Sequence, residues 1–529
     1  MIRCIPVLIL VLIARFSFAQ ENIDVLHYRF HITVNDANDS IYGNAKIKFR
    51  VNEKKPVIAL DLVNRDKDGK GMQAISVTYS NRSQTEIFKH ENDILYIPSR
   101  HNKGDEAEVV INYKGIPANG LVISKNKYGN RTFFADNWPN RGHHWLPCNE
   151  DPADKASVEF IVRAPQHYQV IGNGIQVEET NLPGGLKETH WKEEVPVSTK
   201  VMAIGIAEFA VQLAGIVDGC IPVYSWVYPE DRDQGFYDYG QAVEILPYFI
   251  KHIGPYPYKK LANVESKTMF GGLENANTIF YSEQSITGTR KSESLLAHEI
   301  SHQWFGNMAT EKSFAHLWLS EGFATYLTIL YMEHKYGKDT AQAMLVEDRE
   351  QVIAFTIVNN SPVIDNNTDY MELLNANSYQ KGSWVLHMLR RELGDSVFWK
   401  SLRLFYTRYA GKTALTEDYR KLLEEISGKN LEKFFRQWLY TPGLPRLNIN
   451  WKYDQKHQKV LVSVKQEKTV FEFPLEIGLK DANGKLTVTK FMITKATENF
   501  TIPVKQKPRQ LVADPATSLL FSGNVSEIK

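Results

Sequence analysis

The first two hundred residues alternate hydrophobic and polar positions with a period of two. Apolar side chains stand at every second position from Leu26 to Val34, and the pattern returns from Ala45 to Val51 with charged residues between. This alternation is typical of half-buried β-strands. Turn-forming clusters such as Asp36-Ala37-Asn38-Asp39 separate the runs. We therefore expect residues 20–207 to form an antiparallel β domain.

The period changes to that of amphipathic helices after Tyr237. Apolar residues then recur at three- and four-residue spacing, which predicts helices rather than strands. The predicted helices span residues 241–253, 293–305, 319–336, 341–355, 381–393 and 416–439. Residues 208–440 are therefore expected to form a mainly helical domain.

The end of the chain returns to the strand pattern. Thr441-Pro442-Gly443-Leu444-Pro445 ends the last helix, because proline and glycine interrupt helical hydrogen bonding. Alternation follows in residues 460–464 and 486–488. Residues 441–529 are predicted to form a small β-sandwich, and the whole chain an α+β protein of several domains.

Length and composition agree with several folded domains. The 529 residues are 43% hydrophobic, enough for a core in each domain, and no long stretch has a disordered composition. The net charge is only +1. Because nucleic-acid-binding proteins usually carry a clear positive excess, we expect no nucleic-acid partner. Only Cys148 and Cys220 lie beyond the first few residues, and whether they pair stays open.

The N-terminus has the pattern of an export signal. Arg3 precedes an apolar run over residues 4–14, and the small residues Ser17 and Ala19 follow. The run is about half of the roughly 20 residues that cross a bilayer. We therefore interpret residues 1–19 as a cleaved signal peptide rather than a membrane anchor. The protein is expected to be exported, periplasmic or extracellular, with no stable membrane anchor.

A metal-binding pattern stands inside the second predicted helix. His298 and His302 are four residues apart, so both imidazoles project from one helix face and can bind one ion. Glu299 is held beside the open position of that ion. Zinc with three protein ligands and one open position is the catalytic form of such a site.

The third ligand is expected from the helix that follows. Gly306-Asn307 ends the first helix, and Glu321 stands at the start of the next. A helix, a loop and an antiparallel helix bring Glu321 back beside the histidines. His298, His302 and Glu321 are thus predicted to hold one Zn²⁺ per chain.

Four separated motifs resemble those of the gluzincin aminopeptidases, the family of aminopeptidase N and leukotriene hydrolase. In chain order they are Trp145-Leu146-Pro147-Cys148 with Asp151-Pro152 and Lys155-Ala156, Gly271-Gly272-Leu273-Glu274-Asn275, His298-Glu299-Ile300-Ser301-His302 with Glu321, and Tyr379-Gln380-Lys381-Gly382. The likeness runs from about residue 25 to the end. It implies a saddle-shaped N-terminal β domain, a thermolysin-like catalytic domain and a C-terminal β-sandwich. The sequence resembles a short form of the family that lacks its C-terminal helical domain.

The resemblance also implies roles for single residues. Glu299 is implied as the general base and Tyr379 as the oxyanion stabiliser. The implied substrate-binding residues are Gly271, Gly272, Leu273, Glu274 and Asn275. Among them, Glu274 is expected to hold the free α-ammonium of a peptide. For a second contact to that amine, the stretch ahead of Trp145 offers Asp136 or Asn137.

The sequence therefore predicts a zinc-dependent aminopeptidase acting on peptides with a free N-terminus. Two other enzymes use the same kind of zinc site, an endopeptidase and a leukotriene-hydrolase-like epoxide hydrolase. A noncatalytic scaffold is the third alternative. It is disfavoured because a scaffold has no reason to retain Glu299 and Tyr379 together with all three ligands.

Overall fold

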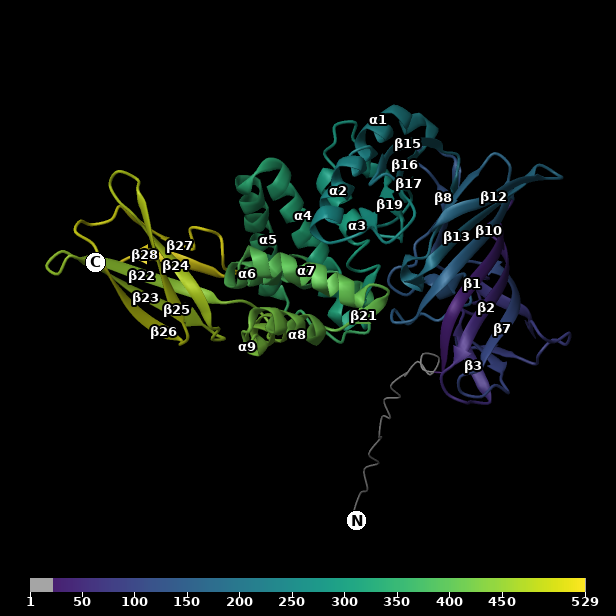
Figure 1. Ribbon diagram of the computed structural model, residues 1–529, viewed down its shortest axis with the longest axis horizontal. Helices are drawn as coiled ribbons and strands as arrows, with labels where there is room; N and C mark the ends of the chain where they lie inside the picture. Colours follow the sequence, from purple (N-terminus) through teal and green to yellow (C-terminus); the bar gives the residue numbers. More distant parts are fainter. Residues whose placement is uncertain (1–21, 529) are drawn as a thin grey trace, which may run out of the picture.

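The computed structural model describes residues 22–528, which form three parts in a row (Figure 1). A β-rich N-terminal part and the C-terminal β sheets lie at opposite ends of an elongated molecule, with the helices between them. The predicted α+β fold class is confirmed. The predicted signal, residues 1–19, lies outside the described residues. Within residues 22–528, no helix is both long and apolar enough to cross a membrane.

Three sheets build the N-terminal part. Their strands are β1 (Ile23–Thr33), β2 (Ile41–Val51), β3 (Val57–Asp61), β4 (Gly71–Tyr79), β5 (Lys89–Glu91), β6 (Ile94–Pro98), β7 (Glu106–Ile116), β8 (Leu121–Lys125), β9 (Arg131–Ala135), β10 (Lys155–Pro165), β11 (Gln169–Gly172), β12 (Ile175–Leu182), β13 (Leu186–Ser198) and β14 (Ile204–Ala207). The strand orders are β12-β13-β10-β1-β2-β7-β4, β11-β14-β9-β8 and β3-β6-β5. Burial follows the alternation in the sequence: Ile47 and Phe49 of β2 are buried, whereas Lys48 and Arg50 are exposed.

One strand pair corrects the prediction of a purely antiparallel domain. β1 runs parallel to β10, from His27 beside Ser157 to Thr33 beside Arg163. Parallel neighbours need a long connection, and here the chain between the two strands forms much of the domain. Alternation of side chains identifies a strand but carries no information on which distant strand becomes its neighbour.

The middle part combines a sheet with helices. Its sheet has the order β15-β16-β17-β19-β18, formed by β15 (Ala210–Val217), β16 (Ile221–Val227), β17 (Leu261–Ser266), β18 (Gly272–Leu273) and β19 (Thr278–Ser282). The helices are α1 (Arg232–Tyr239), α2 (Ala242–His252), α3 (Glu293–Ser301), α4 (Glu321–Tyr336), α5 (Lys338–Val358), α6 (Gly382–Leu393), α7 (Asp395–Tyr409), α8 (Thr416–Ser427) and α9 (Glu432–Phe435). Two short strands, β20 (Ala309–Glu311) and β21 (Lys412–Ala414), pair in parallel. They connect the segment that follows α3 to the segment that precedes α8.

Five predicted helices appear with small boundary shifts as α2 to α6. The sixth prediction, one helix over residues 416–439, is wrong because Gly428 adopts a left-handed conformation at φ 69° and ends α8. The chain resumes as α9 and a further helical turn, Arg436–Tyr440. The sequence analysis also missed α1 and α7.

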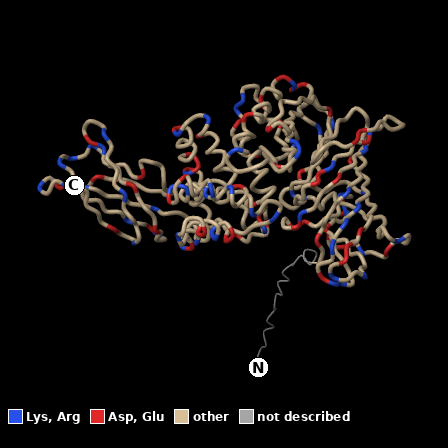
Figure 2. Tube along the Cα trace, viewed as in Figure 1, with Lys and Arg blue, Asp and Glu red and all other residues tan. Residues whose placement is uncertain are grey.

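The C-terminal part consists of two sheets. They contain β22 (Arg446–Asp454), β23 (Lys459–Glu467), β24 (Phe473–Lys480), β25 (Leu486–Ile493), β26 (Thr497–Pro503), β27 (Gln510–Ala513) and β28 (Ser522–Glu527), in the orders β26-β23-β22-β28 and β25-β24-β27. Val460, Val462 and Val464 are buried, as their alternation predicted. Lysine, arginine, aspartate and glutamate are interspersed over all three parts (Figure 2).

Cys148 and Cys220 do not pair with each other. Cys148 is buried, and its carbonyl oxygen accepts a hydrogen bond from the backbone of Asp61 at the end of β3. Cys220 is exposed in the turn between β15 and β16. Whether Cys148 and Cys220 form a disulfide was left open by the sequence, and the structure shows both as free thiols.

Packing of the central helices prepares the site. The hydroxyl of Tyr331, late in α4, donates to Glu293 at the start of α3 at 2.7 Å, so the two helices are antiparallel. α4 also meets α6 closely, since a Cβ on Gly322 would lie 2.8 Å from the Cα of Gly382. This contact brings the helical turn before α6 (Asn377–Lys381), which contains Tyr379, beside the start of α4.

Candidate active site

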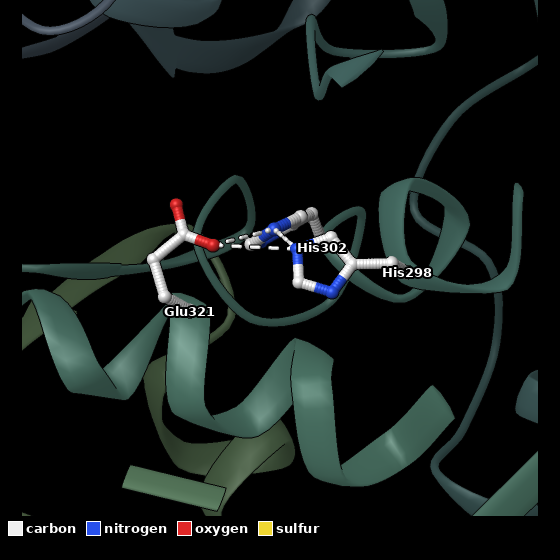
Figure 3. Close-up of side chains that lie close together, drawn as sticks. All are labelled: His298, His302 and Glu321. Carbon is white, nitrogen blue, oxygen red and sulfur yellow. Dashed lines mark hydrogen bonds and ion pairs between the residues drawn. The ribbon is translucent and has the colours of Figure 1, made fainter. Parts of the chain in front are cut away.

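Two histidines and a glutamate converge where α3 ends and α4 begins (Figure 3). The Nε2 atoms of His298 and His302 lie 3.0 Å apart. The Oε2 atom of Glu321 lies 3.3 Å from Nε2 of His298 and 3.2 Å from Nε2 of His302. Among residues 22–528, no other trio of such donor side chains converges in this way.

This donor set fits zinc. Two imidazole nitrogens and one carboxylate oxygen all lie within 4.8 Å of one another, and His₂Glu with one open position is an established catalytic zinc geometry. His302 and Glu321 are buried, whereas His298 is partly exposed and borders a cavity. All three side chains line that cavity, so an ion held by them would be reached from it.

The chain around His302 fixes its imidazole. Its Nδ1 atom lies 3.2 Å from the carbonyl oxygen of Phe305 and 3.1 Å from the hydroxyl of Ser320. With Nε2 bound to a metal ion, Nδ1 would carry the proton and donate it toward these oxygens, which would orient the ring. Gly306 makes this possible: its φ is 116°, and a Cβ there would lie 2.3 Å from the Ser320 hydroxyl. The sequence analysis did not single out Ser320, although it directly precedes the third ligand.

Burial and charge shift the pKa values of the two carboxylates in opposite directions. Burial, together with neighbouring carboxylates, raises the pKa of Glu299 well above its usual value. Burial acts the same way on Glu321, but the adjacent imidazoles of His302 and His298 outweigh it and lower the pKa of Glu321. Glu321 is thus held as an anionic ligand, while Glu299 readily accepts a proton.

Glu299 packs against β18. A Cβ built on Gly272 would lie 2.3 Å from Oε1 of Glu299 and 2.6 Å from its Cγ, so only glycine leaves room for the carboxylate. By contrast, a Cβ on Gly271 would meet nothing nearer than Leu295 at 3.8 Å. β18 is the edge strand of its sheet, so its second backbone edge has no strand partner there.

A cavity of about 450 Å³ joins these groups. Of the residues singled out from the sequence, its walls contain Gly271, Gly272, Leu273, Glu274, His298, Glu299, His302, Glu321 and Tyr379. The structure thus brings most of the predicted site residues together. Asn275 is buried but is not among the lining residues.

Tyr379 faces the first zinc ligand. Its ring lies parallel to the imidazole of His298, with centroids 6.1 Å apart and an interplanar angle of 14°. Burial, reinforced by Glu321 and Glu274, raises the pKa of the Tyr379 phenol well above its usual value. The phenol therefore keeps its proton and can donate a hydrogen bond into the cavity.

Glu274 presents a free carboxylate oxygen. The residue is 5% exposed, and its Oε1 atom is buried without a hydrogen-bond partner. Its carbonyl oxygen accepts hydrogen bonds from Gln303 at 3.3 Å and Asn307 at 2.5 Å. These two amides hold the backbone and leave the side chain available. Sequence reasoning gave neither residue this role: Asn307 was used only to end the helix, and Gln303 directly follows His302.

The structure does not bring Asp136 and Asn137 to the cavity wall. Asp136 is paired with Arg141 and accepts a hydrogen bond from Thr268 at 3.3 Å. The amide nitrogen of Asn137 donates to the carbonyl oxygens of residues 199 and 202, and its oxygen accepts from Trp145 at 2.8 Å. These polar atoms are thus already bonded to protein groups. Asp136 links the N-terminal part to Thr268 of the middle part, whereas Asn137 makes its bonds within the N-terminal part.

A helix-borne pair of histidines, a glutamate from the next helix and a buried glutamate beside them define the centre of a zinc metallopeptidase. Comparison with known families agrees. The Peptidase M1 N-terminal domain matches residues 25–201, and the Peptidase family M1 domain matches residues 237–438. The chain belongs to peptidase family M1, which confirms the resemblance and the predicted zinc cofactor.

Curated relatives are named as aminopeptidases. Aminopeptidase M1-A of Oryza sativa subsp. japonica is 28% identical over 330 residues, covering 59% of this chain and 37% of that protein. Aminopeptidase 2 of Candida albicans is 24% identical over 503 residues, covering 88% of this chain and 52% of that protein. The chain therefore spans about half or less of the length of these relatives.

Two solved structures share the fold. A mutant of the M1 zinc metallopeptidase from Deinococcus radiodurans has a TM-score of 0.68 at 23% identity, covering 81% of this chain and 96% of that one. A mutant of a two-domain M1 zinc metallopeptidase, bound to L-tryptophan, has a TM-score of 0.70 at the same identity and coverage. At this identity the likeness establishes the fold.

Proposed function

We propose that this protein is a zinc-dependent aminopeptidase that hydrolyses the N-terminal peptide bond of peptides. The observation that carries the proposal is Glu274, whose buried, unpartnered carboxylate oxygen lies in the same cavity as the zinc ligands. A buried carboxylate without a cation is costly. The free α-ammonium of a peptide supplies that cation, and the names of the curated relatives support this choice.

The zinc ligands and Glu274 together set the register of cleavage. With the ammonium at Glu274, the first peptide bond lies over His298 and His302. β18 offers an unpaired strand edge along the same wall, and an extended peptide can form backbone hydrogen bonds to such an edge. An endopeptidase needs no carboxylate at this end of the cavity.

The chain supplies the remaining chemistry. Zinc, when bound, acts as a Lewis acid toward the scissile carbonyl and the attacking water. Glu299 takes the proton of that water and passes it to the departing amine, a role that its raised pKa suits. Tyr379 keeps its proton and donates a hydrogen bond to the developing oxyanion.

We also propose that the protein is exported, to the periplasm or the extracellular space. The support is the signal pattern of residues 1–19. Mass spectrometry of the exported protein is expected to show a mature chain that begins at Gln20. Recovery of the intact N-terminus inside the cell would contradict export.

The enzymatic proposal is tested with one peptide in two forms, with a free and with an acetylated N-terminus. Mass spectrometry of the products is expected to show stepwise loss of single residues from the free form only. Glu274→Gln keeps the shape of the side chain but removes its charge, and should lower kcat/KM by more than a hundredfold, about 3 kcal/mol. Efficient internal cleavage of the acetylated peptide would overturn the aminopeptidase assignment.

A further inference from the structure

The cavity continues beyond the zinc ligands, between α4 and α5. On α4, Thr325 and Ile329 follow Glu321 at intervals of four residues and line the cavity with it. On α5, Met344 and Asp348 show the same interval and line the facing wall. The lining of this extension is apolar at Ile329 and Met344 and polar at Thr325, Thr328 and Asp348.

The helix directions place this extension relative to the scissile bond. α4 and α5 form an antiparallel hairpin around Gly337, so Asp348 lies level with the turn of α4 that follows Glu321, about 6 Å along the helix axis. Because α3 and α4 are antiparallel, that turn lies toward Ser294 at the start of α3. Glu274 is held at the opposite end, through Gln303.

Asp348 therefore lies on the side of the zinc site away from the peptide's N-terminus. With the ammonium at Glu274 and the first peptide bond over zinc, the first residue occupies the Glu274 side. The side chain that enters the space near Asp348 then belongs to the second residue, which leaves with the departing amine.

The carboxylate of Asp348 has no countercharge of its own. Its Oδ2 atom is buried and unpartnered apart from the neutral Ser383 hydroxyl, and no ion pair among the described residues involves Asp348. The adjacent Arg349 pairs instead with Asp514 at 3.2 Å. Burial, with a smaller effect of Glu347, raises the pKa of Asp348 to about 7, although the Ser383 hydroxyl acts in the opposite direction. No positively charged side chain of the protein therefore pairs with Asp348 in the cavity.

We propose that Asp348 determines specificity, by pairing with the charged end of a lysine or arginine that is the second residue of the substrate. The methylene groups of such a side chain lie along Thr325, Ile329 and Met344, and its ammonium or guanidinium meets Asp348. The preferred substrate class is therefore peptides with a free N-terminus and a basic second residue. This inference rests on the proposed aminopeptidase activity.

The test compares alanyl-lysyl-alanine with alanyl-norleucyl-alanine, which differ in the charged group. The intact holoenzyme is expected to favour the lysyl peptide at least tenfold in kcat/KM. Asp348→Asn should reduce this ratio to about one. Glu350→Gln removes the same charge from an exposed position on α5 and should keep the ratio. Peptides with lysine or norleucine as the first residue should show no dependence on Asp348.

Equal turnover of the two alanyl peptides, or a preference that survives Asp348→Asn, would overturn the inference. A preference at the first residue that depends on Asp348 would overturn it as well. If no peptide with a free N-terminus is cleaved, the proposed function fails. The role of Asp348 is then decided by how tightly the lysyl and norleucyl peptides bind. Calorimetry with Glu299→Gln measures that binding without turnover. Tighter binding of the lysyl peptide, lost in the Glu299→Gln, Asp348→Asn double variant, would support the inference, and equal binding would refute it.

Discussion

The close contact between Gly272 and Glu299 predicts the effect of adding one methyl group at Gly272. In Gly272→Ala the new Cβ would lie 2.3 Å from Oε1 and 2.6 Å from Cγ of Glu299. Ordinary van der Waals contact needs about 3.4 Å or more, so the carboxylate must move by about 1 Å. Glu299 is 4% exposed and has little space to adapt. A displacement of this size at a catalytic group costs on the order of a hundredfold in rate.

Gly271→Ala is the matched control, because its Cβ would meet only Leu295 at 3.8 Å. Both variants are assayed for turnover of an aminoacyl amide reporter, for zinc content and for thermal stability. Gly272→Ala should lose turnover about a hundredfold while keeping zinc, and Gly271→Ala should remain within severalfold of wild type. Normal turnover in Gly272→Ala, or equal losses in both variants, would refute the placement of Glu299.

Two further predictions concern residues of the helical turn before α6. Tyr379→Phe should keep zinc and lose about two to three orders of magnitude in kcat, because one oxyanion donor is gone; near-normal kcat would remove Tyr379 from the mechanism. Burial lowers the pKa of Lys381 from 10.5 to about 7. Between these values the unfolded chain binds a proton that the folded protein does not, so this residue makes stability rise with pH. The free energy of unfolding of Lys381→Met should therefore rise less between about pH 7.5 and 9.5 than that of wild type, by up to about 2 kcal/mol. Thermal or urea unfolding measures this difference, and an identical dependence of stability on pH in the two proteins would contradict it.

The metal ligands could be predicted from sequence because their geometry is local. His298 and His302 share one turn of α3, and Glu321 follows after one short loop, so helical spacing alone brings them close. The helices around these ligands could also be predicted from local sequence, because each has apolar residues at helical spacing along one face. The single helix predicted over 416–439 failed at Gly428, where a left-handed residue interrupts a stripe that continues beyond it.

Long-range contacts could not be predicted. The parallel pairing of β1 with β10, and the buried pair between Lys200 and Glu311, depend on how distant segments pack. The second of these contacts joins the N-terminal part to β20 of the middle part. Asp348 was equally hidden, because an acidic residue on an amphipathic helix is normally a solvated surface residue. Only the packing of α5 against α4 places it in the cavity.

The most direct test of the account is a zinc titration of the metal-free protein, followed by release of the N-terminal residue from a free peptide. Turnover should rise linearly and reach its plateau at one zinc per chain, and His302→Ala should show no such rise, because one of its three ligands is missing. Turnover that does not depend on zinc, or a full response that persists in His302→Ala, would contradict the assignment of the site.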